Sequence, residues 1–320
     1  MQKMLGNKKA YWIFVIPALV IYLVMAFIPI AMSGYYSTMQ WDGIGEKIFI
    51  GIDNYLELVK DEAFVQIYPL IFLVFFSLKD NNEIYSGNVM GIPDQFQWGN
   101  YENALFNANV GHYLLNSIFV TAVVIIISDI LACMVSYAIA RMRVKANRFV
   151  KLFFSIGLMI PLHAVLLPVF IMLRNLKMLD TYQAIIVPYI AFALPMAIFF
   201  MIGFFQALPL ELEESAFLDG CGIFRTFAVI IVPLVKPALA TISIFTFLST
   251  WNEMMFAITF INSEKYRTLT VGIMQMVGQY TTDWGTMGAG LVVATLPTVI
   301  IYLLFSKQVQ SGMVAGAVKG

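Results

Sequence analysis

Four polar or ionisable residues lie within long apolar stretches of this sequence, and a tryptophan directly precedes two of them. Asp129 is near the middle of one stretch and His163 lies in another, while a third contains Trp251, Asn252 and Glu253 in succession. Polar side chains are costly in lipid and are therefore candidates for a functional role. We interpret the five as candidates to line a path for a polar solute. The alternative is that each polar group forms a hydrogen bond between packed helices.

Catalytic and metal-binding patterns are not found in the sequence. It has no His-Glu-x-x-His, no Gly-x-Ser-x-Gly and no phosphate-binding Gly-x4-Gly-Lys-Ser/Thr motif. The two histidines, His112 and His163, are too few for a typical zinc site. The sequence therefore predicts no catalytic residue, no metal and no cofactor bound by this chain.

A short acidic and polar segment, 214–220, separates two of the apolar stretches. It consists of Glu214, Ser215, Ala216, Phe217, Leu218, Asp219 and Gly220, and it is followed by Ile230 and Pro233. In a chain that is 60% hydrophobic, such a segment must lie in water or against another protein.

The residues around this segment predict a helix–turn–helix over about 207–237. Pro209 suits the start of a helix, and the glutamates that follow it would lie where the helix dipole favours negative charge. Gly220 permits the chain to turn, and an apolar stripe over 224–231 predicts a second short helix. We expect Ser215 and Ala216 to be exposed, allowing close contact with another protein.

The composition indicates an integral membrane protein. Charged residues make up only 12% of the chain, aromatic residues 15%, and the mean hydropathy is +0.82. A soluble domain of this size could not bury so much apolar surface. The formal net charge of zero argues against a nucleic-acid partner, and two cysteines argue against a disulfide framework.

Six apolar stretches are long enough to cross a bilayer as helices, which takes about 20 residues. They are 11–32, 113–140, 152–173, 184–206, 238–261 and 287–305. With six spans, 12 lysines and arginines lie on the same side as the N-terminal lysines and 7 on the other. The positive-inside tendency therefore predicts that both termini are cytoplasmic. The shorter stretch 65–78, which contains Gln66 and Pro69, is read as not crossing.

The first hundred residues contain a repeat. Ile28-Pro29-Ile30 precedes Tyr35-Tyr36-Ser37 at the spacing by which Tyr68-Pro69-Leu70 precedes Phe75-Phe76-Ser77. Only the first copy has a complete apolar helix before it. We therefore interpret 1–67 as the start of one membrane subunit joined, near 64–68, to a related subunit over 68–320. The alternative is a long external loop with chance similarity.

The motifs of the chain resemble those of membrane subunits of binding-protein-dependent ABC importers. The spacing from Glu214 to Gly220, Ile230 and Pro233 is that of the family's Glu-Ala-Ala…Gly…Ile-x-Leu-Pro loop, with Ser215 and Val232 as departures. Trp251-Asn252-Glu253 and the ending Gly-Ala-Val-Lys-Gly resemble the maltose-type sugar permeases, second-subunit type, over about 68–320. Residues 8–65 look more like the opening of the first type of subunit.

The resemblance implies an all-α integral membrane fold, the six-helix transmembrane domain of a type I ABC importer. It implies a second permease subunit in a heterodimer, two cytoplasmic ATPases that use the ATP, and an external sugar-binding protein. The chain would lie in the plasma membrane of a prokaryote, with segment 214–220 inserted into the ATPase and the C-terminal tail reaching toward it. Two alternatives are a fused permease that cannot transport and a secondary transporter not driven by ATP.

Overall fold

The computed structural model describes residues 35, 38–40, 48–53, 69–142, 144–278 and 282–317, with side chains described as far as 305. The chain divides into two compact units. The first comprises 1–72 with 90–92, and the second comprises 73–89 with 93–320.

Within the first unit, the described residues include a two-stranded antiparallel hairpin. Strands β1 (Met39–Gln40) and β2 (Ile48–Phe49) pair with Met39 opposite Phe49. The predicted first span, 11–32, and the predicted junction near 64–68 lie outside the described residues.

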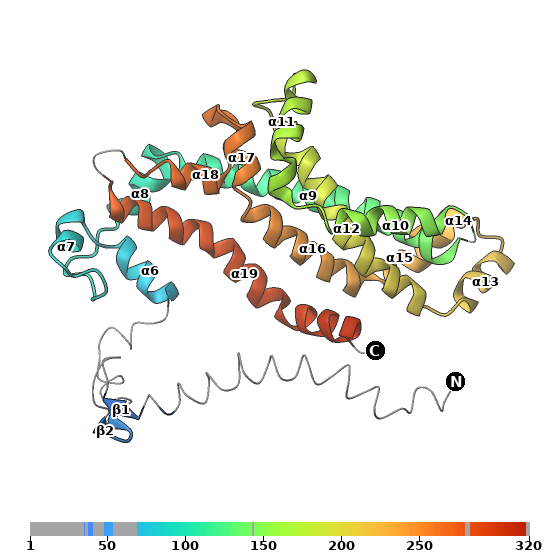
Figure 1. Cartoon of the computed structure of the whole chain (residues 1–320), viewed down its shortest axis with the longest axis horizontal. Helices are drawn as coiled ribbons and strands as arrows, with labels where there is room; N and C mark the ends of the chain where they lie inside the picture. The colour runs from blue at the N-terminus through green and yellow to red at the C-terminus, as the bar shows by residue number, and fades with distance from the viewer. Residues whose placement is uncertain are drawn as a thin grey trace. The chain divides into compact units, whose positions relative to one another are not determined.

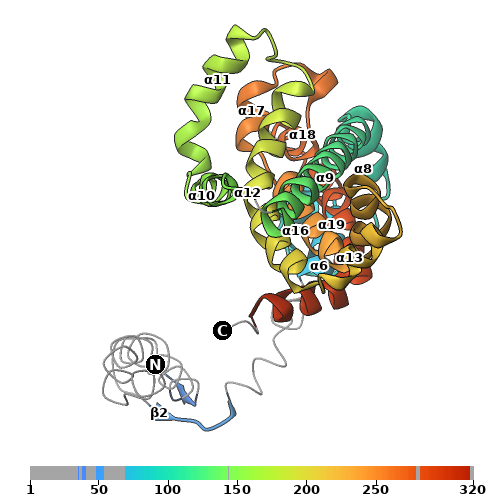
Figure 2. The ribbon, with the colours of Figure 1, turned by 90° about the vertical axis from the view of Figure 1, so that its right-hand side faces the viewer.

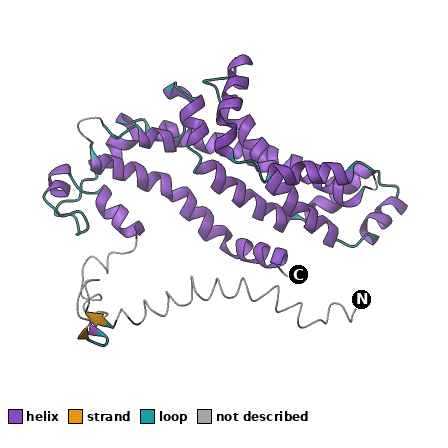
Figure 3. Ribbon diagram, in the orientation of Figure 1, coloured by secondary structure: helices purple, strands orange, loops and turns teal. Residues whose placement is uncertain are grey.

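The second unit is built on four long helices. They are α9 (Val110–Arg141), α12 (Gln183–Ala207), α16 (Lys236–Trp251) and α19 (Trp284–Ala317). Helix α9 packs against α12 and α16, and α16 packs against α19 (Figure 1). Figure 3 shows that the rest of this unit is also helical or looped.

Shorter elements precede and connect the long helices. They are α6 (Pro69–Ser77), α7 (Asn81–Tyr85), α8 (Gly99–Glu102), η2 (Asn103–Asn107), α10 (Asn147–Gly157), η3 (Leu162–Val165), α11 (Leu166–Asn175), α13 (Glu211–Leu218), α14 (Ile223–Arg225), η4 (Thr226–Ile231), α15 (Val232–Leu234), α17 (Met255–Phe260), η5 (Glu264–Tyr266) and α18 (Leu269–Met274). Elements α13 to α15 lie at one end of the bundle, and α7 and α8 lie at the other (Figure 1).

Three predicted spans are confirmed as single helices long and apolar enough to cross a membrane. Stretch 113–140 is α9, 184–206 is α12 and 287–305 lies within α19. Helix α12 remains continuous although Pro188 and Pro195 lie inside it. If each of two bent helix pairs is one span, the described residues contain up to five spans.

The predicted span over 152–173 is a bent pair of helices rather than a single helix. Helices α10 and η3–α11 meet at an angle of 95°, so the stretch is broken at 158–161. Pro161 disfavours helical backbone in the residue before it and is itself extended, with ψ of 127°. Helix α10 ends at Gly157, which packs closely against Pro195 of α12. A Cβ at this position would lie 2.8 Å from the proline ring. Figure 2 shows α10 and α11 beside the bundle, next to α12.

The predicted span over 238–261 is likewise interrupted. Helix α16 ends at Trp251, and the separate six-residue helix α17 begins at Met255. At its other end α16 meets the helical segment 223–234 at a bend of 76°. Pro237, near the start of α16, lacks the N–H that a continuous helix would use.

Three apolar clusters hold the second unit together. One, near α13, joins α9, α12 and α16 through residues such as Tyr137, Phe205 and Ile242. The second joins α9 and α12 to α11 and α17, and the third joins α9 and α16 to α18 and α19.

Candidate functional site

Helix α13 is the acidic segment predicted from the sequence, and its end has a defined geometry. Three glutamates occupy its first turn. At its other end the N–H of Cys221 donates to the carbonyl of Ala216 at 2.9 Å, and that of Gly220 to Phe217 at 3.0 Å. With Gly220 at φ +78°, these bonds form a Schellman motif that satisfies carbonyls at the helix end.

The exposure predicted for the small residues of α13 is only half correct. Ser215 is exposed, but Ala216 is 3% exposed and faces the bundle. Glu214 and Asp219 are exposed, whereas Glu213 is buried. The surface of α13 open to another protein therefore combines Glu214 and Ser215 with the apolar side chains of Phe217 and Leu218, which are 48% and 88% exposed.

The residues that follow α13 return the chain to the bundle. Ile230, in η4, packs against the apolar cluster that contains Tyr137. Pro233, in α15, is exposed. The predicted second short helix is present as a continuous helical segment, 223–234, made of α14, η4 and α15, and part of its apolar stripe anchors the segment.

A buried ion pair joins α13 to the end of α9. The Nε of Arg141 lies 3.7 Å from Oε2 of Glu213, and both side chains are less than a tenth exposed. Arg141 also donates through Nη2 to the carbonyl of Leu208, the C-cap of α12, at 2.6 Å. Removing one partner of such a pair typically costs about 3–5 kcal/mol because the other charge remains buried.

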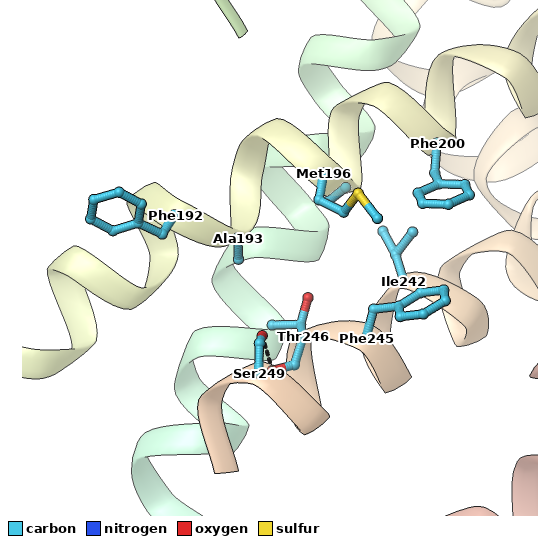
Figure 4. Close-up of a pocket in the computed structure, with 9 residues that line it drawn as sticks. Phe192, Ala193, Met196, Phe200, Ile242, Phe245, Thr246 and Ser249 are labelled. Atoms are coloured by element: carbon cyan, nitrogen blue, oxygen red, sulfur yellow. Dashed lines mark hydrogen bonds between the residues drawn. The ribbon is translucent and has the colours of Figure 1, made fainter. Parts of the chain in front are cut away.

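A cavity of about 250 Å³ lies between α12 and α16 and is lined by aromatic rings and two hydroxyl-bearing residues (Figure 4). The residues drawn are Phe192, Ala193, Met196, Phe200, Ile242, Phe245, Thr246 and Ser249, together with Ala197. The Ser249 hydroxyl donates to the carbonyl of Thr246 at 3.0 Å.

A neighbouring cavity of about 280 Å³ extends this space toward the break between α16 and α17. The two cavities share Phe192, Ala193 and Ser249, and the second is also lined by Tyr189 and Glu253. We call the residues of α12, of α16 and of the break after α16 that line either cavity the channel-side surface. Aromatic faces beside hydroxyl and carboxylate groups can hold a ligand that has both apolar faces and hydroxyl groups.

Glu253 is the one predicted path residue that lines this surface. Its Oε1 accepts from the N–H of Phe256 at 2.8 Å and its Oε2 from that of Ala257 at 3.3 Å. The hydroxyl of Tyr189 donates to the same carboxylate. Glu253 therefore both starts α17 and ties the break in the apolar stretch to α12.

The two residues before Glu253 lie elsewhere. Trp251 is buried, stacks on Phe247 at 5.3 Å, and donates through Nε1 to the carbonyl of Ala294 in α19 at 3.1 Å. Its role is to join helices. Asn252 is exposed, and its amide donates to the carbonyl of Leu248 at 2.8 Å.

Asp129 and His163 lie apart from Glu253. Asp129 accepts from the hydroxyl of Ser243 at 2.5 Å, which joins α9 to α16, and it lines a separate cavity of about 420 Å³ beside Cys133. His163 is exposed within η3, at the 95° bend. For Asp129, the structure matches the alternative of a hydrogen bond between helices.

Several residues of the site were not predicted, notably Tyr189, Ser249 and Arg141. One signal for Ser249 was available, because Thr246, Ser249 and Glu253 are spaced by three and four residues and so share a helix face. Arg141 was counted only as a positive charge. Its partner is distant in sequence, and no local pattern reveals it.

Comparison with known proteins gives the class of this molecule. Residues 132–314 match the family described as the binding-protein-dependent transport system inner membrane component. The chain therefore belongs to this family of ABC importer permeases, and it is a multi-pass membrane protein.

The matches to individual relatives extend over most of the length of each relative. The trehalose/maltose transport system permease protein MalG of Thermococcus litoralis is 31% identical over 262 residues, 81% of this chain and 93% of the relative. The diacetylchitobiose uptake system permease protein NgcG of Streptomyces coelicolor is 31% identical over 254 residues, covering 79% and 84%. A solved bacterial ABC transporter involved in alginate import has the same fold, with a TM-score of 0.68 at 24% identity over 79% of this chain and 94% of that one.

Proposed function

We propose that this chain is the membrane-spanning permease subunit of an ATP-driven carbohydrate importer. The observation that carries the proposal is α13, an acidic helix ended by a left-handed glycine and anchored at one end of an apolar bundle. The exposed face with Glu214 and Ser215 docks on a cytoplasmic ATPase. ATP is bound and hydrolysed by two such subunits, and this chain binds no cofactor.

The proposed assembly has three further kinds of component. A second permease completes the translocation path as a heterodimer, and an external sugar-binding protein delivers the substrate. Because α13 faces the ATPase, it lies on the cytoplasmic side of a prokaryotic plasma membrane. Both termini then lie on that side, in agreement with the distribution of lysine and arginine.

The sugar is proposed to pass along the channel-side surface of α12 and α16. Rings such as Phe192 stack on sugar faces, while Ser249 and Glu253 bond to hydroxyl groups. The relatives support a carbohydrate as the substrate class, since their names specify trehalose/maltose and diacetylchitobiose.

The fusion proposal concerns residues 1–67. The matches to the two relatives span 254 and 262 residues of this chain, which is close to the length of segment 68–320. This supports a permease core over 68–320, preceded by the start of a paired permease. The proposal is tested by sequencing the parent locus. A single uninterrupted gene with no neighbouring full-length second permease would count against it.

The docking role of α13 is tested with Glu214→Lys. The tagged chain is expressed with its ATPase, and the ATPase retained on purification is quantified. We expect at least a tenfold loss of retained ATPase, equivalent to about 1.4 kcal/mol, because a lysine replaces the acidic contact. Glu102→Lys, at the other end of the bundle and also exposed, is the control. If the wild-type chain retains no ABC ATPase, the assignment is wrong.

The path is tested with Ser249→Leu, which fills the space shared by both cavities. Uptake by the reconstituted importer should fall about tenfold or more, a change of ~1.4 kcal/mol in barrier height, while ATPase retention is unchanged. Thr259→Leu is the control, since this hydroxyl donates to its own helix at Met255 and lines neither cavity. Equal uptake by wild type and Ser249→Leu would exclude this surface as the path.

A further inference from the structure

A cluster of buried polar groups lies beneath α13, on the side opposite its exposed surface. Arg141, the last residue of α9, contacts Glu213 of α13 and the carbonyl of Leu208 at the end of α12. The end of α9 therefore meets α13 and the end of α12 through one guanidinium group, although Arg141 lies 67 residues from Leu208 in the sequence.

The cluster is enclosed by aromatic rings. Tyr137, one turn before Arg141, packs edge-on against Phe205 of α12 at 5.8 Å and lies 5.0 Å from the ring of Phe227 in η4. The contact between α13 and the bundle is thus polar at its centre and apolar around it.

Not every polar atom of the cluster is satisfied. Oε1 of Glu213 and Oγ1 of Thr226 are buried without a hydrogen-bond partner, and Nε of Arg141 has an ion pair but no hydrogen bond. Leaving such groups unpaired costs stability. A contact selected for stability alone would have fewer unpaired groups, so the charges point to a role in positioning.

The arrangement of α13 separates two functions on neighbouring residues. Glu214 faces outward, where the proposed ATPase binds, whereas Glu213 faces inward to Arg141. If a bound partner displaces α13, the movement reaches the bundle through the contacts that attach α13 to it. Separating the buried charges would be costly, so Arg141 and Glu213 hold together while α13 moves.

We propose that Arg141 and Glu213 are positioning residues that make α13 move as one body with the ends of α9 and α12. They transmit the movement of the docked helix to the two helices, one of which, α12, lines the channel-side surface. This inference rests on the proposed function, because it assigns the route by which ATPase closure reaches the translocation path.

The first test measures the attachment itself in the full chain and needs no transport partner. Spin labels are placed at Leu218 of α13 and Met134 of α9, which are 88% and 51% exposed, after the native Cys133 and Cys221 are replaced. We expect a narrow distance distribution that broadens in Glu213→Gln. Glu211→Gln, the same change at an exposed position of the same helix, leaves it narrow. An unchanged distribution in Glu213→Gln would overturn the proposal.

The second test separates coupling from folding. Glu213→Gln and the neutral double variant Arg141→Gln/Glu213→Gln are reconstituted with the ATPase, the second permease and the binding protein. We expect each to lose uptake per ATP hydrolysed by about tenfold, within the usual range of coupling between sites. If the pair only stabilises the fold, the double variant, which buries no unpaired charge, should recover wild-type uptake.

The outcomes distinguish this inference from the proposed function. If Glu213→Gln loosens α13 but no ATPase binds the wild-type chain, only the proposed function fails. If the wild-type importer is active and both variants transport normally, only the inference about Arg141 and Glu213 fails.

Discussion

Gly220→Val is expected to lower substrate uptake about tenfold, because it strains the turn that ends the docking helix. Gly220 has φ of +78°, where an L-residue costs roughly 1–2 kcal/mol and a β-branched one is especially disfavoured. The lost Schellman geometry would redirect the chain after Asp219. Uptake and substrate-stimulated ATP hydrolysis by the reconstituted importer are the measurements.

Gly222 provides a matched control for this experiment. It lies two residues further on with extended backbone, φ −76° and ψ 161°, and a Cβ at either glycine has nothing within 4 Å. Gly222→Val should therefore leave uptake unchanged. Equal losses in the two variants would mean that bulk, rather than the left-handed turn, impairs docking. Asparagine tolerates left-handed backbone better than valine, so uptake by Gly220→Asn should lie between that of Gly220→Val and that of Gly222→Val.

Gly285→Ala is expected to destabilise the second unit by about 2 kcal/mol or more, the upper part of the range for an overpacked core. A Cβ at Gly285 would lie 2.2 Å from the backbone oxygen of Lys79 and 2.5 Å from the amide of Asn100. That oxygen is held by a 2.8 Å hydrogen bond from Asn100, whose amide also bonds Ser77. Because the obstacle is backbone, no side-chain rotation relieves the contact.

The measurement is the unfolding of the purified chain in detergent. Gly203→Ala is the control, since a Cβ there meets nothing within 4 Å. It should unfold like the wild type, and Gly285→Ala should unfold earlier. Equal stability would show that the start of α19 is free to move away from the segment after α6.

Apolar length alone was enough to predict three of the long helices. Stretches 113–140, 184–206 and 287–305 became α9, α12 and α19 because a lipid-exposed chain must satisfy its backbone groups within each helix. Hydropathy does not report the direction of the helix axis, however, so it did not reveal the bend at Pro161 or the break after Trp251. There, proline and side-chain bonds to Glu253 decide the backbone.

For the site, the sequence predicted which types of residue are present but not which side chains are buried or which residues they contact. The glutamates of α13 and the turn at Gly220 follow from local rules. The burial of Ala216 depends on what packs against α13, and the contact of Arg141 with Glu213 joins residues 72 positions apart. Trp251 and Glu253 are only two positions apart, yet they face α19 and α12 respectively.

The break after Trp251 has a consequence for the surrounding bilayer. At 1.5 Å per residue, the 16 residues of α16 are about 24 Å long, whereas the hydrocarbon layer is about 30 Å thick. Helix α16 alone is therefore too short to cross this layer, and in the described residues it reaches the length of a span only together with the bent segment 223–234. Irregular backbone within the layer is tolerated only beside protein or water. Within a bilayer, the break at Asn252 and Glu253 therefore has to face protein or water rather than lipid.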